Sequence, residues 1–220
     1  MSYAALQEKK SELIRKALDG SVFVAPDSVP SLGALTTTGG ELLPLPSGWG
    51  DLGHLSTDAA AFARATETTK VRSFGSVEST REDVTSDEIT MAINAQETKK
   101  QVIGLFTGAD VAALRATAGS GEVAIAKPDR PKPRYYRVLG LFVDEVEAGE
   151  IYFGRYMPRS RITEFGDQNM GEGDDPIQYP MTFTGYKDSA VGFSHRWHWA
   201  GPGWLALLAS MGFDREPTTP

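Results

Sequence analysis

The sequence predicts a mainly β fold, a sandwich or barrel of antiparallel strands with one helix inserted between them. Apolar and polar residues alternate over 89–94 and again over 179–184, which is the period of a strand with one buried face. Residues 135–143 are apolar on both faces, as in a central strand. Between the alternating segments, residues 96–107 carry an apolar stripe at helical spacing.

The first sixty residues predict one helix, one strand and a long loop. Residues 3–18 place one apolar stripe among charges and end at Gly20, so we expect an N-terminal helix or arm over 1–20. A short strand follows over 21–25 and stops at Pro26. Residues 26–58 are rich in proline, glycine, serine and threonine. A loop longer than about 12–15 residues is usually functional or disordered.

The middle of the chain predicts a pair of strands followed by the helix. Period-two alternation begins near Ala59, and residues 77–84 are polar but capable of forming a strand. Asn94 with Glu97 three residues later forms a capping-box pattern, and Gly108 is a good C-terminal stop. We therefore expect the helix to span 96–107.

The remaining segments complete a single domain over 1–220. A loop at 116–134 precedes the central strand, and Glu147–Gly149 predicts a hairpin turn. We expect strands at 151–157, 158–165, 179–184 and 191–199, an acidic loop at 166–176, and a short C-terminal helix and tail within 201–220.

Composition excludes several classes of protein. The net charge of −7 makes the chain a poor candidate for gripping DNA, because such proteins neutralise phosphates with cations. Cysteine is absent, so no disulfide framework or thiolate metal site is expected. No apolar run reaches the ~20 residues of a membrane span, and the charged N-terminus does not resemble a signal peptide. We expect a soluble, cytosolic chain.

The motifs that could support catalysis or metal binding are weak. His195 and His198 are three apart in an expected strand, so they point to opposite faces and cannot share a metal without a bulge. His195 is better interpreted as a core histidine whose ring nitrogens are hydrogen-bonded. The acidic loop 167–175 has glycine and acid at the wrong positions for a calcium loop, although a weak cation site stays open. No nucleophile elbow or phosphate-binding loop is present. We predict no enzyme activity, no cofactor and no required metal.

The basic run 127–137 suggests a linker or a subunit contact more than a nucleic-acid site.

The order of segments resembles a known family. Trp49-Gly50-Asp51-Leu52-Gly53 opens a pair of strands that end at Glu97-Thr98-Lys99 and a helix, and Arg134–Val143 and Tyr179–Thr184 follow. This order is similar to the major tail protein, or tail tube protein, of long-tailed bacteriophages (siphophages), especially those infecting actinobacteria. Two other classes stay open. One is the tube subunit of a secretion or contractile-injection system, and the other is a carbohydrate-binding β-sandwich that uses Trp197, Trp199 and Trp204.

The resemblance implies a structural role in the virion. Subunits of the family close a barrel in hexameric rings, and the rings stack around a tape measure protein between tail terminator and distal tail proteins. Double-stranded DNA passes through the lumen during ejection, and assembly takes place in the host cytoplasm. In this reading 26–58 is a stacking loop.

The resemblance also directs the choice of candidate residues. Because DNA must not adhere to the channel, we expect an acidic or neutral polar lumen wall. The lumen candidates are Glu78, Glu82, Asp87, Glu88, Thr90 and Asn94. The candidate contacts between subunits are large apolar residues in the long loop: Leu42, Leu43, Leu45, Trp49, Leu52 and Leu55. The basic run 127–137 should lie away from the channel.

Overall fold

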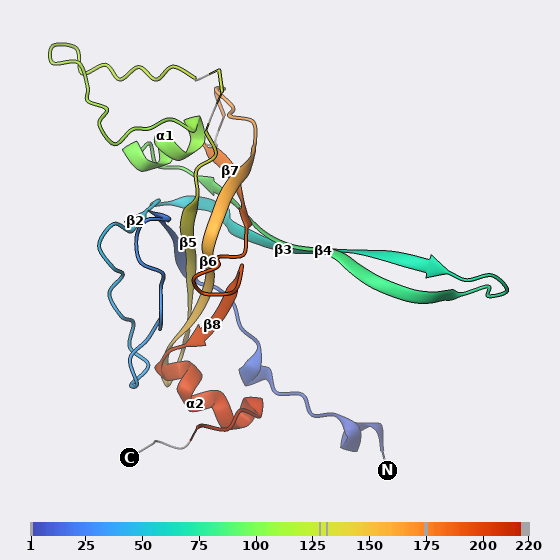
Figure 1. Cartoon of the computed structure of the whole chain (residues 1–220). Coiled ribbons are helices and arrows are strands. Elements are labelled where there is room, and N and C mark those ends of the chain that lie inside the picture. The colour runs from blue at the N-terminus through green and yellow to red at the C-terminus, as the bar shows by residue number, and fades with distance from the viewer. Residues whose placement is uncertain (1, 128, 131, 174–175, 217–220) are drawn as a thin grey trace.

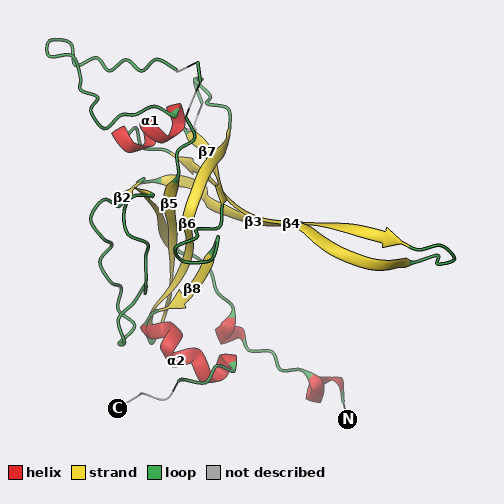
Figure 2. Ribbon diagram, viewed as in Figure 1, coloured by secondary structure: helices red, strands yellow, loops and turns green. Residues whose placement is uncertain are grey.

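The structure is a computed structural model that describes residues 2–127, 129–130, 132–173 and 176–216. The prediction of a mainly β fold with a helix between strands is confirmed (Figure 2). The elements are β1 (Asp19–Pro26), β2 (Gly50–Asp51), β3 (Leu55–Arg72), β4 (Ser79–Ala95), α1 (Lys100–Thr107), β5 (Tyr136–Val146), β6 (Gly149–Phe165), β7 (Tyr179–Gly185), β8 (Arg196–Ala200) and α2 (Pro202–Met211).

The strands form one antiparallel sheet in the order β2-β1-β5-β6-β7-β4-β3. The long strand β6 has two partners on one edge, because β8 pairs with its first half and β7 with its second half. The two ends of the path, β2 and β3, are consecutive in the chain and joined only by residues 52–54. The sheet must therefore curl, which brings its ends together around one core.

The larger core lies inside this curl and is covered by α1. The alternating residues Ile89, Met91 and Ile93 point into it, together with Val102 and Leu105 of the helix. The period-two pattern of β4 thus reports the face that packs inward. A second core lies on the other side of the sheet, where Leu32 and Leu35 of the long loop cover Leu139, Tyr152 and Tyr156.

Strands β3 and β4 continue beyond the core as a projecting arm, which we define as residues 63–88 (Figure 1). Phe62 opposite Met91 is the last pair in which both residues pack against the core, and Ile89 is the last core residue of β4. Beyond it almost every side chain of both strands is exposed. The arm is held by its own ladder and cross-strand side-chain pairs, because no core supports it.

The N-terminal helix prediction is wrong. Residues 3–18 contain only two short 3₁₀ turns, Tyr3–Leu6 and Ser11–Leu13. Leu6, Ile14 and Leu18 of the apolar stripe are exposed, so most of the stripe is not packed against its own chain. Short helices are marginal in water without such packing.

The start of the inserted helix is also corrected. Strand β4 continues through Ala95, which pairs with Leu55, so Asn94 cannot cap a helix. Glu97 instead accepts a hydrogen bond from the His54 backbone N–H at 2.7 Å and holds the chain between β2 and β3. The helix begins only at Lys100, whereas its end at a left-handed Gly108 agrees with the prediction.

Other boundaries also differ from the prediction: β2 and the first residues of β3 lie inside the predicted 26–58 loop, where they pair with β1 and β4. Residues 158–165 are not a separate strand but the second half of β6. The strand predicted over 191–199 is shorter, because β8 begins at Arg196. The C-terminal helix α2 spans Pro202–Met211 inside the predicted 201–220 segment, and proline fits its first helical turn.

Candidate functional site

The projecting arm is the most conspicuous surface available for assembly. Its strands expose polar and charged side chains along their length, and its tip carries two fully exposed apolar residues, Phe74 at 108% and Val77 at 97%. The outer edge of β3 has no strand partner among the described residues. An unpaired edge and an exposed apolar tip both favour contact with another chain.

The register of the arm divides the predicted lumen residues between two faces. An extra residue in β4, Thr85, makes a bulge, so the side chains of β4 change face there. Glu88, Thr90 and Asn94 lie on the face opposite the buried row of Ile89. Asp87 and, across the bulge, Glu82 lie on the other face, and Glu78 lies in the turn before β4. The six residues do not form one surface.

Charges along the arm are mostly paired with each other. Asp87 binds Arg64 through two hydrogen bonds of 2.7 and 2.6 Å, and this hydrogen bonding lowers the pKa of the carboxyl group. Glu82 lies 4.0 Å from Lys70, and Asp83 lies 2.7 Å from Arg81. The face of Glu88 therefore keeps its negative charge, while the face of Asp87 is largely neutralised.

The long loop contributes less exposed apolar surface than the sequence suggested. Leu52 is completely buried, Leu55 packs against the larger core, and Leu45 and Trp49 pack against the second core. Their apolar character is used inside their own chain. Leu42 and Leu43 are exposed, beside a small bridge between Thr36 and Leu42. Only these two remain available for a neighbouring subunit.

The basic run does not form one cationic patch. Arg137 is buried in β5, where it donates to Asp188 at 3.0 Å and to backbone carbonyls of the 26–29 segment. Arg134 lies 3.5 Å from Asp110. Sequence spacing could not separate these roles, because both arginines belong to the same short basic segment. Positions 128 and 131 of the run lie outside the described residues.

His195 and His198 lie immediately before β8 and within it, respectively. His195 is buried and packs against Trp197 with ring centroids 4.4 Å apart. Neither of its ring nitrogens has a hydrogen-bond partner among the described residues, so the expected satisfied core histidine is only half correct. Burial, with Arg155 and His198 nearby, lowers the pKa of His195 to about 4. Within the described part of the chain, no three His, Cys, Asp or Glu side chains gather as metal ligands.

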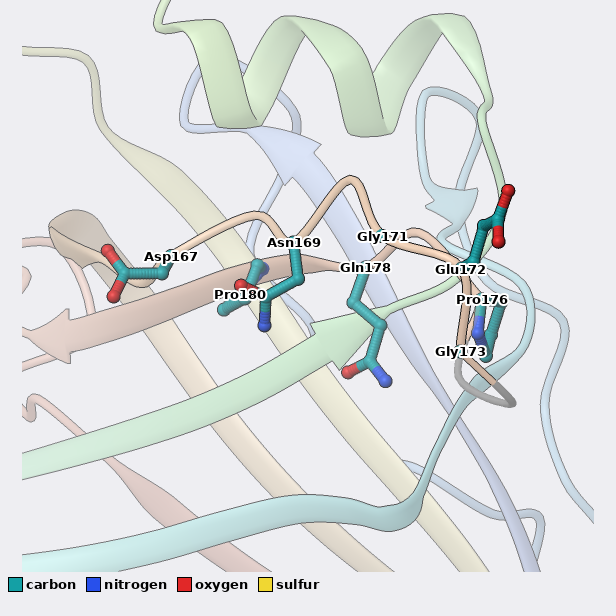
Figure 3. A pocket seen from close by; sticks show the side chains of 8 residues that line it. All are labelled: Asp167, Asn169, Gly171, Glu172, Gly173, Pro176, Gln178 and Pro180. Carbon is teal, nitrogen blue, oxygen red and sulfur yellow. The ribbon is translucent and has the colours of Figure 1, made fainter.

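The acidic loop after β6 forms a shallow hollow of about 270 Å³. Asp167 and Glu172 lie at its opposite ends, so their carboxylates do not converge (Figure 3). Asp174 and Asp175, the other acids of the predicted weak cation site, lie outside the described residues.

The tryptophans do not form an open stacking row. Trp197 and Trp199 are exposed on the same side of β8. However, Trp199 is stacked on Trp204 at 6.2 Å, and the guanidinium of Arg155 lies 5.3 Å from its ring centre. These contacts use the ring inside the chain, which counts against the carbohydrate-binding hypothesis.

A second hollow, of about 420 Å³, lies at the base of the arm and was missed by sequence reasoning. Its wall includes Phe62, Phe142, Phe153 and Arg155, which come from three different strands. No local pattern links these residues. The only sequence signal is that each lies in or near a segment expected to form a strand, which does not say what lies opposite.

Comparison with known proteins gives one family match over most of the chain. A family model described as "Phage tail tube protein" matches residues 7–204. No curated protein matches the chain. A solved structure titled "Virion of native gene transfer agent (GTA) particle" is similar at 11% identity, with a TM-score of 0.34, over 70% of this chain and 92% of that chain.

A second similar structure is titled "Cryo-EM structure of the anti-feeding prophage (AFP) baseplate, 6-fold symmetrised". Its identity is 10% and its TM-score 0.39, over 84% of this chain and 97% of that chain. Separately, no helix in the described part of the chain is long and apolar enough to cross a membrane.

Proposed function

The chain belongs to the phage tail tube protein family, and from this membership we propose that it is the major tube subunit of a siphophage tail. In this proposal six copies form a ring, rings stack into a tube, and DNA leaves the virion through the lumen. Assembly takes place in the host cytoplasm around a tape measure protein, between terminator and distal tail proteins. The role is structural rather than catalytic and uses no cofactor.

The observation that carries the proposal is the arm formed by β3 and β4. Two strands of 18 and 17 residues extend past the core, and beyond Phe62 and Ile89 they expose nearly all their side chains. A monomer gains little from such an extension, because it buries almost no apolar surface. In a ring, the free edge of β3 would find a partner strand on the next subunit, which would close the sheet and remove the exposed edge.

The same geometry narrows the candidate surfaces. We place the lumen wall on the face of β4 that carries Glu88, Thr90 and Asn94, which keeps its negative and polar character. Leu42 and Leu43 are the loop residues proposed to contact a neighbouring subunit.

Electron microscopy of the purified protein tests the proposal. We expect negative-stain images of rings or tubes, from the protein alone or co-expressed with the tape measure protein of its own tail, and sixfold class averages along the ring axis. Sedimentation as a monomer at every concentration and under both conditions would contradict it.

A further inference from the structure

We propose that the tip of the arm, residues 73–78, docks into the hollow at the base of the arm of a second copy of this chain. This inference rests on the proposed function and names the contact that would join one subunit to the next. Phe74 would enter the aromatic hollow, and Glu78 would pair with Arg155.

The tip of the arm has the composition of a surface that becomes buried in a contact. Phe74 and Val77 are fully exposed, and together they make the apolar end of an otherwise polar arm. The acids of Asp87, Glu82 and Asp83 already have cations close by. Glu78 has no cation within 4.0 Å among the described residues. The tip thus offers an aromatic ring beside a free carboxylate.

The hollow offers the complementary chemistry. The guanidinium of Arg155 lies 5.8 Å from the centre of the Phe62 ring, and no carboxylate of the described residues lies within 4.0 Å of it. Burial lowers the pKa of Arg155, which a docked carboxylate would offset. A cavity of ~150 Å³ admits a benzene molecule. The 420 Å³ hollow therefore has room for a phenyl ring and a carboxylate.

The tip cannot fill the hollow of its own subunit. Asp58, on the wall of the hollow, and Phe74 are separated by 16 residues, nearly all of them in the extended strand β3. At about 3.3 Å per residue they lie roughly 50 Å apart. The occupant must be another copy. Such a head-to-tail contact uses two different surfaces, so it generates rings or open stacks rather than closed dimers.

Disulfide trapping tests the contact directly, because the chain has no cysteine of its own. Phe74→Cys with Asp58→Cys, oxidised after assembly, should give a ladder of multimers on non-reducing gels. Phe74→Cys alone should give at most dimers. Phe74→Cys with Ser120→Cys, at another exposed loop, should give no ladder. Absence of the ladder from assembled double-cysteine protein would overturn the inference.

Charge reversal gives a second measurement that does not depend on disulfide geometry. Glu78→Arg should raise the critical concentration for assembly about tenfold, and Glu78→Arg with Arg155→Glu should restore it. Glu122→Arg, an exposed control, should assemble like the wild type. If Arg155→Glu does not fold, Arg155→Gln replaces it as the single variant. Wild-type assembly that Glu78→Arg leaves unchanged refutes the docking alone, whereas a wild type that never assembles refutes the proposed function as well.

Discussion

Arg137 and Asp188 form a buried ion pair, with an N–O distance of 3.0 Å, that fastens the long loop and the β7–β8 connection to the middle of the sheet. The guanidinium also donates to the carbonyls of Asp27, Val29 and Pro158. Asp188 accepts from the Ala190 backbone N–H, and that bond together with Arg137 lowers its pKa. One arginine therefore connects three segments that lie far apart in the sequence.

We predict that Asp188→Ala lowers the free energy of unfolding by about 3–5 kcal/mol, since it leaves a buried guanidinium without its partner. Urea denaturation followed by tryptophan fluorescence measures the change. Arg64→Ala, which breaks the exposed pair with Asp87 on the arm, is the matched control and should have no measurable effect. Equal effects of the two substitutions would contradict the assignment of Arg137–Asp188 as the structural pair.

Lowering the pH should reduce the free energy of unfolding because of His195. Its pKa is about 4 in the fold and about 6.5 in an unfolded chain. Between these values the unfolded state takes up a proton that the folded state does not, so acidification favours unfolding. One pKa unit corresponds to ~1.4 kcal/mol, which predicts a loss of about 3 kcal/mol between pH 7.5 and pH 4. His195→Phe should flatten this dependence, and an unchanged pH profile would refute the prediction.

Alanine substitutions at two glycines with positive φ distinguish the energetic cost of backbone strain from that of a steric clash. Gly212 ends α2 at φ 84° with open space around it, so Gly212→Ala should cost about 1–2 kcal/mol from the left-handed conformation alone. Gly201, at φ 111°, also faces the carbonyl oxygen of Glu150, where a Cβ would clash. Gly201→Ala should therefore cost about 1–3 kcal/mol more. Thermal unfolding of both variants measures the difference in stability. Equal losses of stability would show that β6 shifts away from the added Cβ at no energetic cost.

Charge on the proposed lumen face should control whether DNA is retained. Glu88→Lys adds cations to every ring, and repeated phosphate contacts multiply a weak attraction. We expect tubes of this variant to retain DNA at low salt and release it at high salt, measured by co-sedimentation. Glu147→Lys, at the exposed β5–β6 turn, is the control. Retention by the control but not by Glu88→Lys would place the lumen elsewhere.

Local sequence patterns predicted many of the strands because they depend on nearest neighbours. The alternation at Ile89, Met91 and Ile93 reported a buried face, and proline and glycine ended elements at Pro26 and Gly108. The helix start was misplaced because a capping-box pattern at Asn94 competed with strand pairing that only the fold reveals. The same reason explains Leu52, whose apolar side chain looked like an interface anchor but fills its own core.

The sequence by itself determined that this is a mainly β chain with an inserted helix, and its segment order already resembled the tail tube family. Only the tertiary structure decided where β3 and β4 leave the core, which lumen candidates share a face, and that Arg137 is buried. It also decided that Arg155 stands in an aromatic hollow with no carboxylate of the described residues within 4.0 Å of its guanidinium. Periodicity records whether a side chain is buried, but the partner of that side chain comes from a distant strand through the register of the sheet.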